Sequence, residues 1–441
     1  MDSALNSGDT AWLLTSAALV LLMIPGLAFF YGGMVRVKSV LNMLMMVMGA
    51  LFVVGVLWVI VGYSMSFGDS YGQLGLLGNV TQYFDLQGLM ADNPDVAYPA
   101  MAFVAFQAMF ACITVGLIAG AVADRMKFAA WMVFAGIWAL LVYFPVAHWV
   151  FNLAGDNGGW IYKMGVIDFA GGTAVHINAG IAGLVLAIVV GKRLGWPKTP
   201  MRPNNLTLVM IGAGLLWFGW FGFNAGSATA ANNAAAVAFI NTFAATCAAA
   251  IGWLVTEKIR DGHATSLGAA SGIVAGLVAI TPACAAVSPI GAMAIGVIAG
   301  VLCALAVSLK YKLKYDDSLD VVGVHLVGGL TGTLLIGLFA TAESPTGIDG
   351  LLYGGGFDQL GKQLVGAGAV LGYSLVMTAI IAVVLRVIMG LRITEDQEVG
   401  GIDLAEHAEQ AYELTDASGG VFAGIGKASV LAGSSYQEEG R

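Results

Sequence analysis

The amino-acid sequence predicts an all-α integral membrane protein, and three features of its composition indicate this fold class. The chain has 441 residues, of which 59% are hydrophobic and only 10% are charged, whereas a soluble domain carries roughly 25% charged residues. Its mean hydropathy is +0.84. Glycine accounts for 61 residues, about twice its usual share, and small residues let transmembrane helices approach closely. Together these features predict a compact bundle of membrane-spanning helices.

Charge and motif content exclude several other classes of protein. The formal net charge of −8 argues against nucleic acid as a partner, because a polyanion binds basic surfaces. The sequence contains no His-Glu-x-x-His, nucleophile elbow or phosphate-binding loop, so we expect neither an enzyme nor a metal or cofactor site. The four cysteines lie in apolar stretches without metal-ligand spacing, which favours a role as small core side chains.

Eleven stretches are apolar over the ~20 residues that a helix needs to cross a bilayer. The first of them follows a segment without a basic side chain, so we expect a retained helix and not a cleaved signal peptide. We expect the membrane-spanning helices to begin near residues 11, 40, 98, 127, 168, 204, 232, 266, 288, 321 and 362.

The basic residues predict how these helices are oriented. When successive connections are assigned alternately to the two sides, every Lys and Arg falls on one side except Lys163 and Lys362. Basic connections stay in the cytoplasm, so we expect the N-terminus outside and the C-terminus inside a cell membrane. This arrangement requires an odd number of helices and agrees with eleven.

Two stretches, residues 168–183 and 317–332, resemble each other. Valine comes directly before a histidine in both, and glycines follow the histidine at the fourth and seventh positions. An aspartate also precedes each histidine by eight residues, in the pairs Asp168–His176 and Asp317–His325. The shared spacing indicates an internal repeat.

The positions of the matches predict an inverted repeat. They fall on the fifth and tenth expected helices, and a weaker match relates residues 26–33 on the first to residues 219–226 on the sixth. A repeat of five helices is odd, so its second copy must lie inverted in the membrane. Eight helical residues span ~12 Å, which brings His176 and His325 from opposite faces toward the middle of the bilayer, where such transporters bind substrate.

Other roles for these histidines are open. A single histidine in an apolar helix is commonly a hydrogen-bonded core residue, and we expect this role for His148, which has no counterpart in the repeat. Ionisable groups at membrane depth are costly and mark functional sites, which favours function for His176 and His325. Two histidines also ligate haem iron in some helical bundles, and a Soret band would reveal such a protein.

Several longer motifs give the sequence a family resemblance. They are Asp168-Phe-Ala-Gly-Gly-Thr-Ala-Val-His-Ile-Asn-Ala-Gly180, Gly219-Trp-Phe-Gly-Phe-Asn-Ala-Gly-Ser227, Ser266-Leu-Gly-Ala-Ala-Ser-Gly272, Ile280-Thr-Pro-Ala-Cys284, Asp316-Asp-Ser-Leu-Asp-Val-Val-Gly-Val-His325 and Leu391-Arg-Ile-Thr-Glu-Asp-Gln-Glu-Val-Gly-Gly-Ile-Asp403. In these motifs and their order the sequence resembles the ammonium transporter family, the Amt/Mep branch whose wider relatives are the Rh proteins. The resemblance implies an eleven-helix homotrimer with one ammonium or ammonia pathway through each subunit.

The resemblance also implies roles for individual residues. Phe110 and Phe223 match the family's stacked pore gate, and His176 and His325 match its twin histidines. Asp317, Asp320 and Thr281 are expected to support the pore. An outer recruitment site for ammonium is expected from Phe106, Phe110, Phe151 and Ser227, with Asp168 beneath it. Asp168 is expected either to contact the cation or to order the backbone as a helix cap.

One position departs from the family pattern. The family usually completes its aromatic cage with a tryptophan three residues after a histidine, and here Phe151 stands three residues after His148. Tryptophan offers the strongest cation–π face, so this substitution puts the affinity of the outer site in doubt. Rotation of Trp149 or Trp160 into the cage is an alternative.

Physical chemistry indicates how such a pathway works. An intact cation in an apolar pore loses its hydration, and a charge at the bilayer centre is heavily penalised. A cation–π contact recovers ~2 kcal/mol or more when desolvated, which concentrates ammonium without carrying it across. We therefore expect deprotonation near the phenylalanine gate and passage of ammonia along neutral imidazoles, which both accept and donate hydrogen bonds. Separate transfer of the proton would make transport electrogenic. An electroneutral ammonia gas channel and an ammonium sensor are the alternatives.

We expect three regions in the chain. Residues 1–390 form the transmembrane ammonium-conducting domain, and residues 391–416 form an acidic cytoplasmic region. The resemblance implies that the acidic region docks on the cytoplasmic face and couples subunits, and that a PII-type signalling protein binds there; a solvated charged tail is the alternative. Residues 417–441 are expected to be disordered.

Overall fold

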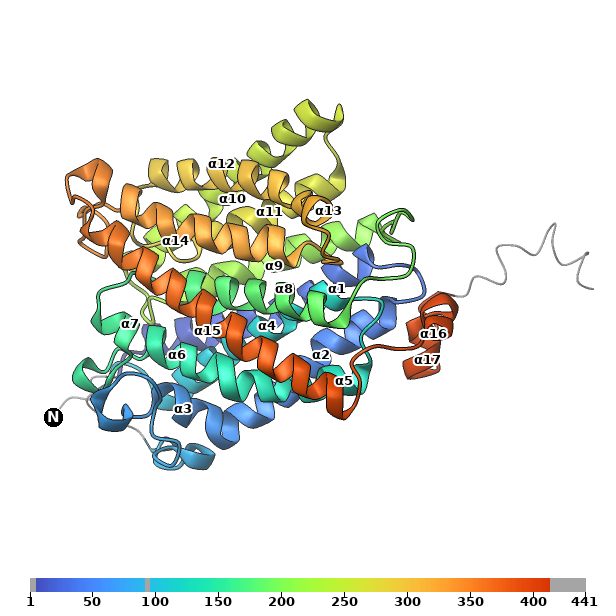
Figure 1. Cartoon of the computed structure of the whole chain (residues 1–441). Helices are drawn as coiled ribbons and strands as arrows, with labels where there is room; N and C mark the ends of the chain where they lie inside the picture. The colour runs from blue at the N-terminus through green and yellow to red at the C-terminus, as the bar shows by residue number, and fades with distance from the viewer. Residues whose placement is uncertain (1–4, 92–95, 413–441) are drawn as a thin grey trace, which may run out of the picture.

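The computed structural model describes residues 5–91 and 96–412, and every regular element in them is helical. The helices pack into one bundle (Figure 1). They are α1 (Ser7–Met34), α2 (Val40–Leu57), α3 (Tyr63–Phe67), α4 (Ala100–Ile118), α5 (Phe128–Trp138), α6 (Phe144–Phe151), α7 (Trp160–Lys163), α8 (Asn178–Val190), α9 (Leu206–Gly226), α10 (Asn233–Asp261), α11 (Ser266–Ile280), α12 (Pro289–Ala306), α13 (Leu309–Leu313), α14 (Val327–Phe339), α15 (Asp358–Ile388), α16 (Glu395–Gly400) and α17 (Ile402–His407).

The observed helices follow the hydropathy pattern. Within the described residues, ten helical stretches are long and apolar enough to cross a membrane. The remaining apolar helix, α11, has 15 residues and is shorter than the others. Each predicted start lies within four residues of the start of one of these ten stretches or of α11, where the stretches that contain α8 and α14 begin with π-helical turns at Gly172 and Val322. The prediction of an all-helical, multi-pass membrane protein is therefore confirmed.

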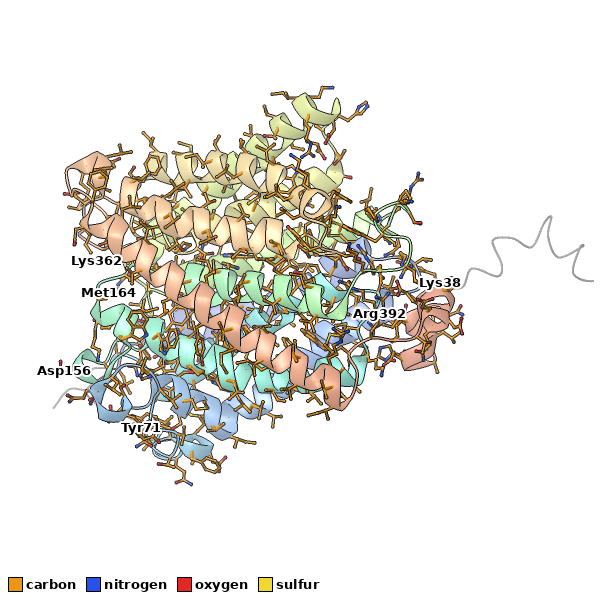
Figure 2. All side chains as sticks on the ribbon, viewed as in Figure 1. Lys38, Tyr71, Asp156, Met164, Lys362 and Arg392 are labelled. Atoms are coloured by element: carbon orange, nitrogen blue, oxygen red, sulfur yellow. The ribbon has the colours of Figure 1, made fainter. Side chains whose placement is uncertain are left out.

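The two ends of the bundle carry different side chains. Figure 2 places Lys38 and Arg392 at one end, and Asp156, Met164 and Lys362 at the other. We call the first the basic end and the second the acidic end. Helices α16 and α17 lie at the basic end (Figure 1). The tail at residues 417–441, for which disorder is expected, lies outside the described residues.

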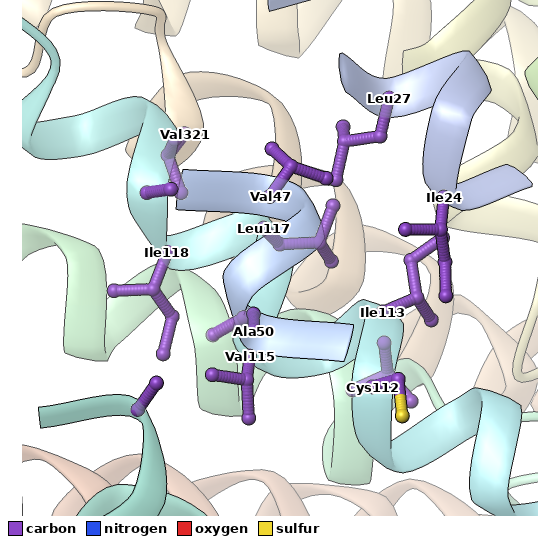
Figure 3. Packing of buried hydrophobic residues seen from close by; sticks show 14 of the residues in the cluster. Ile24, Leu27, Val47, Ala50, Cys112, Ile113, Val115, Leu117, Ile118 and Val321 are labelled. Carbon is purple, nitrogen blue, oxygen red and sulfur yellow. The ribbon is translucent and has the colours of Figure 1, made fainter. Parts of the chain in front are cut away.

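Small residues let α1 approach α9 closely. A Cβ atom on Gly33 of α1 would lie 2.6 Å from the carbonyl oxygen of Asn205, and one on Gly222 of α9 would lie 2.9 Å from the carbonyl oxygen of Ser16. Figure 3 shows the apolar packing of α1 against α2 and α4, where Ile24 lies near Ile113. Close backbone approach of this kind is typical of helices packed in membranes.

Several membrane helices contain a π-helical turn, which the hydropathy pattern does not reveal. Two of these turns hold the repeat histidines. Gly172–Ile177 leads into α8 and contains His176, and Val322–Leu326 leads into α14 and contains His325. Because π turns are rare and frequently lie at functional sites, their presence at both histidines marks these helix starts as a candidate site.

The segment after α15 is tied to the basic end by carboxylates. Asp403 accepts hydrogen bonds from the backbone N–H groups of Leu41 and Asn42 at 3.1 and 2.7 Å. Glu406 accepts one from the N–H of Phe128 at 2.9 Å. These groups begin α2 and α5, where N–H groups have no partner within the helix and negative charge is favoured. Helix α17 therefore caps two membrane helices.

Candidate functional site

A cavity of about 610 Å³ is lined in part by α3 and α7, which lie at the acidic end of the bundle (Figure 1). Its lining includes three of the residues expected at an outer recruitment site, namely Phe151, Asp168 and Ser227. The lining also includes six further aromatic side chains: Tyr63, Phe67, Tyr98, Phe103, Tyr162 and Phe169. We call this cavity the vestibule. It offers aromatic faces, a hydroxyl and a carboxylate, the groups that attract a small cation.

Asp168 orders the backbone at the base of the vestibule. Its carboxylate accepts hydrogen bonds from the N–H groups of Gly171, Gly172 and Thr173 at 2.7, 2.6 and 2.8 Å. It also accepts a short hydrogen bond from the Thr173 hydroxyl. Gly171 has φ +115°, a conformation that glycine adopts without steric cost. Asp168 therefore caps the π turn that holds His176, and its oxygens are used by the backbone.

A stack of phenylalanine rings lies deeper than the vestibule. Phe110 and Phe223 have ring centroids 4.0 Å apart and planes 12° apart. Phe110 also contacts Phe151 edge-on, with centroids 6.1 Å apart, and Phe106 at 4.9 Å. Phe106 and Phe110 are fully buried and do not line the vestibule. The ring contacts therefore run from Phe151, which lines the vestibule, through Phe110 to Phe223.

The structure brings His176 and His325 together. Their Nδ1 atoms are 3.3 Å apart, and their rings lie nearly parallel with centroids 5.4 Å apart. Both side chains are buried. No described residue hydrogen-bonds the Nε2 atom of His176. A buried polar atom without a partner is costly, so this nitrogen is available to a guest molecule.

A second cavity, of about 10 Å³, lies beside the histidines. This volume is about that which a single water-sized molecule needs. The lining combines Phe223 and the two histidines with apolar side chains from several helices: Met23, Leu27, Phe30, Ile113, Leu117, Val175, Leu216, Trp220 and Val274. We call it the inner cavity. Its wall is apolar apart from the two histidines and the indole of Trp220.

Trp220 is a member of this site that the sequence analysis missed. Its ring stacks on His176 with centroids 5.4 Å apart, and its indole N–H donates a hydrogen bond to the Thr281 hydroxyl at 2.8 Å. Thr281 thus supports the site by fixing Trp220. The signal was present in the sequence, because Trp220 precedes Phe223 by three residues and so shares its helix face.

The two histidine segments contact each other in a reciprocal way. A Cβ atom on Gly180, four residues after His176, would lie 2.5 Å from the backbone nitrogen of Leu326. One on Gly329, four residues after His325, would lie 3.1 Å from the backbone nitrogen of Ile177. Each repeat glycine therefore lets its helix touch the residue that follows the other histidine.

Asp317 and Asp320 differ from Asp168 in their contacts. Asp317 accepts a hydrogen bond from the N–H of Val322 at 2.7 Å, at the start of the π turn that holds His325. Asp320 forms an ion pair with Lys310, with Nζ and Oδ1 2.7 Å apart. Asp317 therefore caps the π turn that holds His325, whereas the carboxylate of Asp320 is paired with Lys310.

Neither neighbouring tryptophan replaces Phe151 at the vestibule. Trp149 donates its indole N–H to the carbonyl of Leu76 at 2.7 Å and packs against Trp160 and Tyr373, with ring centroids 5.8 and 4.7 Å away. Neither Trp149 nor Trp160 lines the cavity. Phe151 is the aromatic residue present at this position.

His148 has the structural environment expected for it. The ring is buried, and its Nδ1 lies 3.0 Å from the carbonyl oxygen of Ser66. It lines neither the vestibule nor the inner cavity.

The fold and the site define a class of protein: a multi-pass membrane protein in which a ring stack separates an aromatic vestibule from a narrow, histidine-lined cavity. Comparison with known proteins identifies the family. Residues 11–412 match the model of the Ammonium Transporter Family, and the chain belongs to this family.

Individual relatives agree with this assignment. An "Ammonium transporter" from Mycobacterium bovis is 61% identical, over 94% of this chain and 92% of the relative. The crystal structure of Saccharomyces cerevisiae Mep2 has a TM-score of 0.82 and 34% identity, and covers 90% of this chain and 89% of its own. A structure titled "Sensor Amt Protein" has a TM-score of 0.83 and 29% identity, covering 91% and 98%. The chain is accordingly a cell-membrane protein of a family that transports ammonium.

Proposed function

We propose that this protein recruits ammonium in the vestibule, removes a proton near the phenylalanine stack and conducts ammonia past the histidine pair. The observation that carries the proposal is the inner cavity, which has room for about one small molecule beside a histidine nitrogen without a partner among the described residues. An apolar wall offers nothing to replace the hydration of a cation. Ammonia loses much less on entering and gains a hydrogen bond to imidazole.

The geometry of the pair assigns opposite roles to the two outer nitrogens. With both rings neutral, only one Nδ1 atom can donate across the 3.3 Å contact, and the other must accept. Each neutral imidazole carries one proton. The Nε2 atom of the Nδ1 donor is therefore a hydrogen-bond acceptor, and the Nε2 atom of the other ring is a donor. Ammonia, which both accepts and donates, is complementary to this arrangement.

Selectivity follows from the same arrangement. Potassium is attracted by the aromatic vestibule but has no proton to release, so it must enter the inner cavity as an ion. Water enters as a neutral molecule but has no charge for the cation–π contacts to concentrate. We propose that the vestibule and the ring stack act together as the filter.

The finer features of the fold are part of the proposal. We propose eleven spans, with α11 as the shortest, and an inverted repeat of five helices. The reciprocal contacts of Gly180 and Gly329 support the repeat. The separation of Lys38 and Arg392 from Lys362 supports a cytoplasmic basic end and an outer vestibule. A homotrimer and a PII-type partner at the basic end rest on family membership, as does a regulatory role for residues 391–416.

The fate of the proton separates two modes of transport. Deprotonation yields ammonia, which enters the inner cavity, and a proton, which we propose crosses separately along waters and the histidine pair. Transport is then electrogenic. Phenylalanine at position 151 favours the alternative, an electroneutral gas channel, because a weaker cage recruits the cation less strongly. The relative titled as a sensor makes ammonium sensing the third candidate.

Current recorded from proteoliposomes under an imposed ammonium gradient tests the proposal. We expect a current in the wild type, none with potassium in place of ammonium, and an altered or abolished current in His176→Ala/His325→Ala. His263→Ala is the matched control, since this exposed histidine lies outside the pathway. A rise in lumenal pH without current would identify a gas channel instead, and the absence of both would favour a sensor.

Replacing Phe151 by tryptophan is expected to strengthen recruitment. A tryptophan face binds a cation more strongly than a phenylalanine face, so the ammonium concentration for half-maximal uptake should fall by about threefold. Saturation curves for uptake by Phe151→Trp and wild type measure this effect, with Tyr162→Trp as a control at another vestibule position. Equal curves for Phe151→Trp and wild type would remove this residue from the recruitment site.

A further inference from the structure

A cavity of about 420 Å³ lies at the basic end and belongs to neither part of the ammonium pathway. Its wall is formed by the α1–α2 connection, the α8–α9 connection and helix α16. The lining residues are Arg36, Val37, Lys38, Ser39, Arg202, Asn204, Glu398 and Val399. The volume falls in the ~300–1,000 Å³ range of pockets that bind small molecules. We call it the basic pocket.

The cationic side chains of the basic pocket outnumber the carboxylate that faces them. Glu398 is fully engaged elsewhere, because its Oε1 accepts the N–H of Leu194 at 2.7 Å and its Oε2 accepts Arg392 at 2.6 Å. Neither Lys38 nor Arg202 forms an ion pair or side-chain hydrogen bond with any described residue. These two positive charges therefore have no counter-charge among residues 5–91 and 96–412.

Arg36 is only loosely held at the same wall. Its Nε lies 3.5 Å from Asp124 and its Nη2 lies 4.0 Å from Glu398. Asp124 also pairs with Arg193 at 3.2 Å. No hydrogen bond to the buried Nε atom of Arg36 is formed by the described part of the chain. A third cation is thus left with unused donors beside Lys38 and Arg202.

The backbone holds Lys38 and Arg202 in place. The carbonyl of Lys38 accepts a hydrogen bond from the N–H of Asp403 at 3.1 Å. Arg202 lies between Pro200 and Pro203, whose rings restrict the backbone. The N-terminus of α2 does not create the positive character, because its N–H groups already bind Asp403. The pocket is positive because of its side chains, which are carried on constrained segments.

We propose that the basic pocket binds a phosphate-bearing anion. A phosphate monoester carries a charge of about −1.5 to −2 at neutral pH and three acceptor oxygens. Guanidinium groups bind such oxygens in pairs, and a lysine adds a point charge. The three cationic side chains Arg36, Lys38 and Arg202 match the negative charge and the acceptor oxygens of such a phosphate group. The phosphate belongs either to a soluble solute or to a lipid headgroup, and this site is independent of the proposed ammonium pathway.

The test measures binding to the full-length chain and distinguishes the two sources. In uncharged detergent, inorganic phosphate and ATP are titrated at constant ionic strength while the thermal midpoint Tm is recorded, since a ligand that binds the native state raises Tm saturably. In a second arm, vesicles of phosphatidylcholine with and without phosphatidic acid, whose headgroup is a phosphate monoester, replace the soluble probes. A soluble source predicts a saturable rise in the first arm, and a headgroup predicts it only in the second.

Lys38→Gln/Arg202→Gln is the test variant, and Lys198→Gln/Lys312→Gln is the matched control with the same loss of charge. All four positions are exposed, so both variants should fold and transport ammonium without phosphate as the wild type does. We expect the test variant to weaken half-saturation at least about tenfold and the control to leave it within about twofold. No saturable response to any probe, or an equal loss in the control, would overturn the proposal.

Discussion

Replacing Asp168 by alanine is expected to destabilise the protein and abolish ammonium transport. The side chain accepts hydrogen bonds from three consecutive N–H groups and a hydroxyl at the start of the π turn. An unsatisfied buried donor costs about 1–3 kcal/mol, and water reaches this part-buried site only in part. We expect a loss of about 3 kcal/mol or more, together with displacement of His176. Thermal unfolding in detergent and uptake in proteoliposomes measure the two effects.

Two further variants distinguish the capping hydrogen bonds of Asp168 from an effect of its negative charge on the cation. Asp168→Asn keeps one acceptor oxygen and should fall between the wild type and Asp168→Ala in both stability and uptake. Asp156→Ala, a change at an exposed aspartate of the same end, should behave as the wild type. If Asp168→Asn kept full stability but lost all uptake, the carboxylate charge would act on the cation and the capping role would not suffice.

The membrane-spanning helices could be predicted because hydropathy alone marks them. Lipid requires every backbone polar group to be satisfied inside the segment, so a long apolar run has few alternatives to a helix. Hydropathy does not predict where a helix departs from regular α-helical geometry. The π turns at His176 and His325 have the same apolar composition as the α-helical turns around them, so the average hydropathy does not reveal them.

In the candidate site, too, some features could be predicted from the sequence and others could not. The spacing of the repeat related His176 to His325, and the structure places their rings side by side. The repeat also pairs Asp168 with Asp317, but Asp317 accepts fewer backbone hydrogen bonds and lies beside the Lys310–Asp320 pair. Sequence symmetry does not include the side chains that neighbouring helices contribute. The spacing from Phe223 places Trp220 on the same helix face, but the contact of its ring with His176 depends on how the helices pack.

The contacts of the acidic segment after α15 could not be predicted, because its hydrogen-bond partners are distant in the sequence. Its charge was evident in the sequence, yet a solvated tail and a docked segment have the same composition. Asp403 caps α2 across 361 residues of sequence separation from Asn42, and no local pattern encodes such a pair. Asp403 and Glu406 bind N–H groups at helix N-termini, and Glu398 binds Arg392, so these three carboxylates have specific partners.

Replacing Asp316 by alanine is expected to be the most destabilising change at the basic end. Its two oxygens bind the guanidinium of Arg193 at 2.8 and 3.0 Å, and one of them also accepts the N–H of Arg193 at 2.7 Å. The Arg193 side chain is 4% exposed and that of Asp316 is fully buried. Removing one partner of a buried pair costs about 3–5 kcal/mol, because the other charge stays buried. Thermal unfolding in detergent at neutral pH measures the loss.

The matched control is Asp261→Ala, which removes the partner of the exposed Arg260 at the end of α10 and should change Tm little, because water replaces the contact. The pH dependence supplies a second check. Burial opposes ionisation of Asp316, but the hydrogen bonds and charge of Arg193 outweigh it and hold its pKa below the usual value. The stabilisation is therefore complete at neutral pH and is lost as the pH falls through that lowered pKa. The difference in Tm between the wild type and Asp316→Ala should shrink on acidification, and a difference that stays constant would show that packing, not the ion pair, is what the substitution removes.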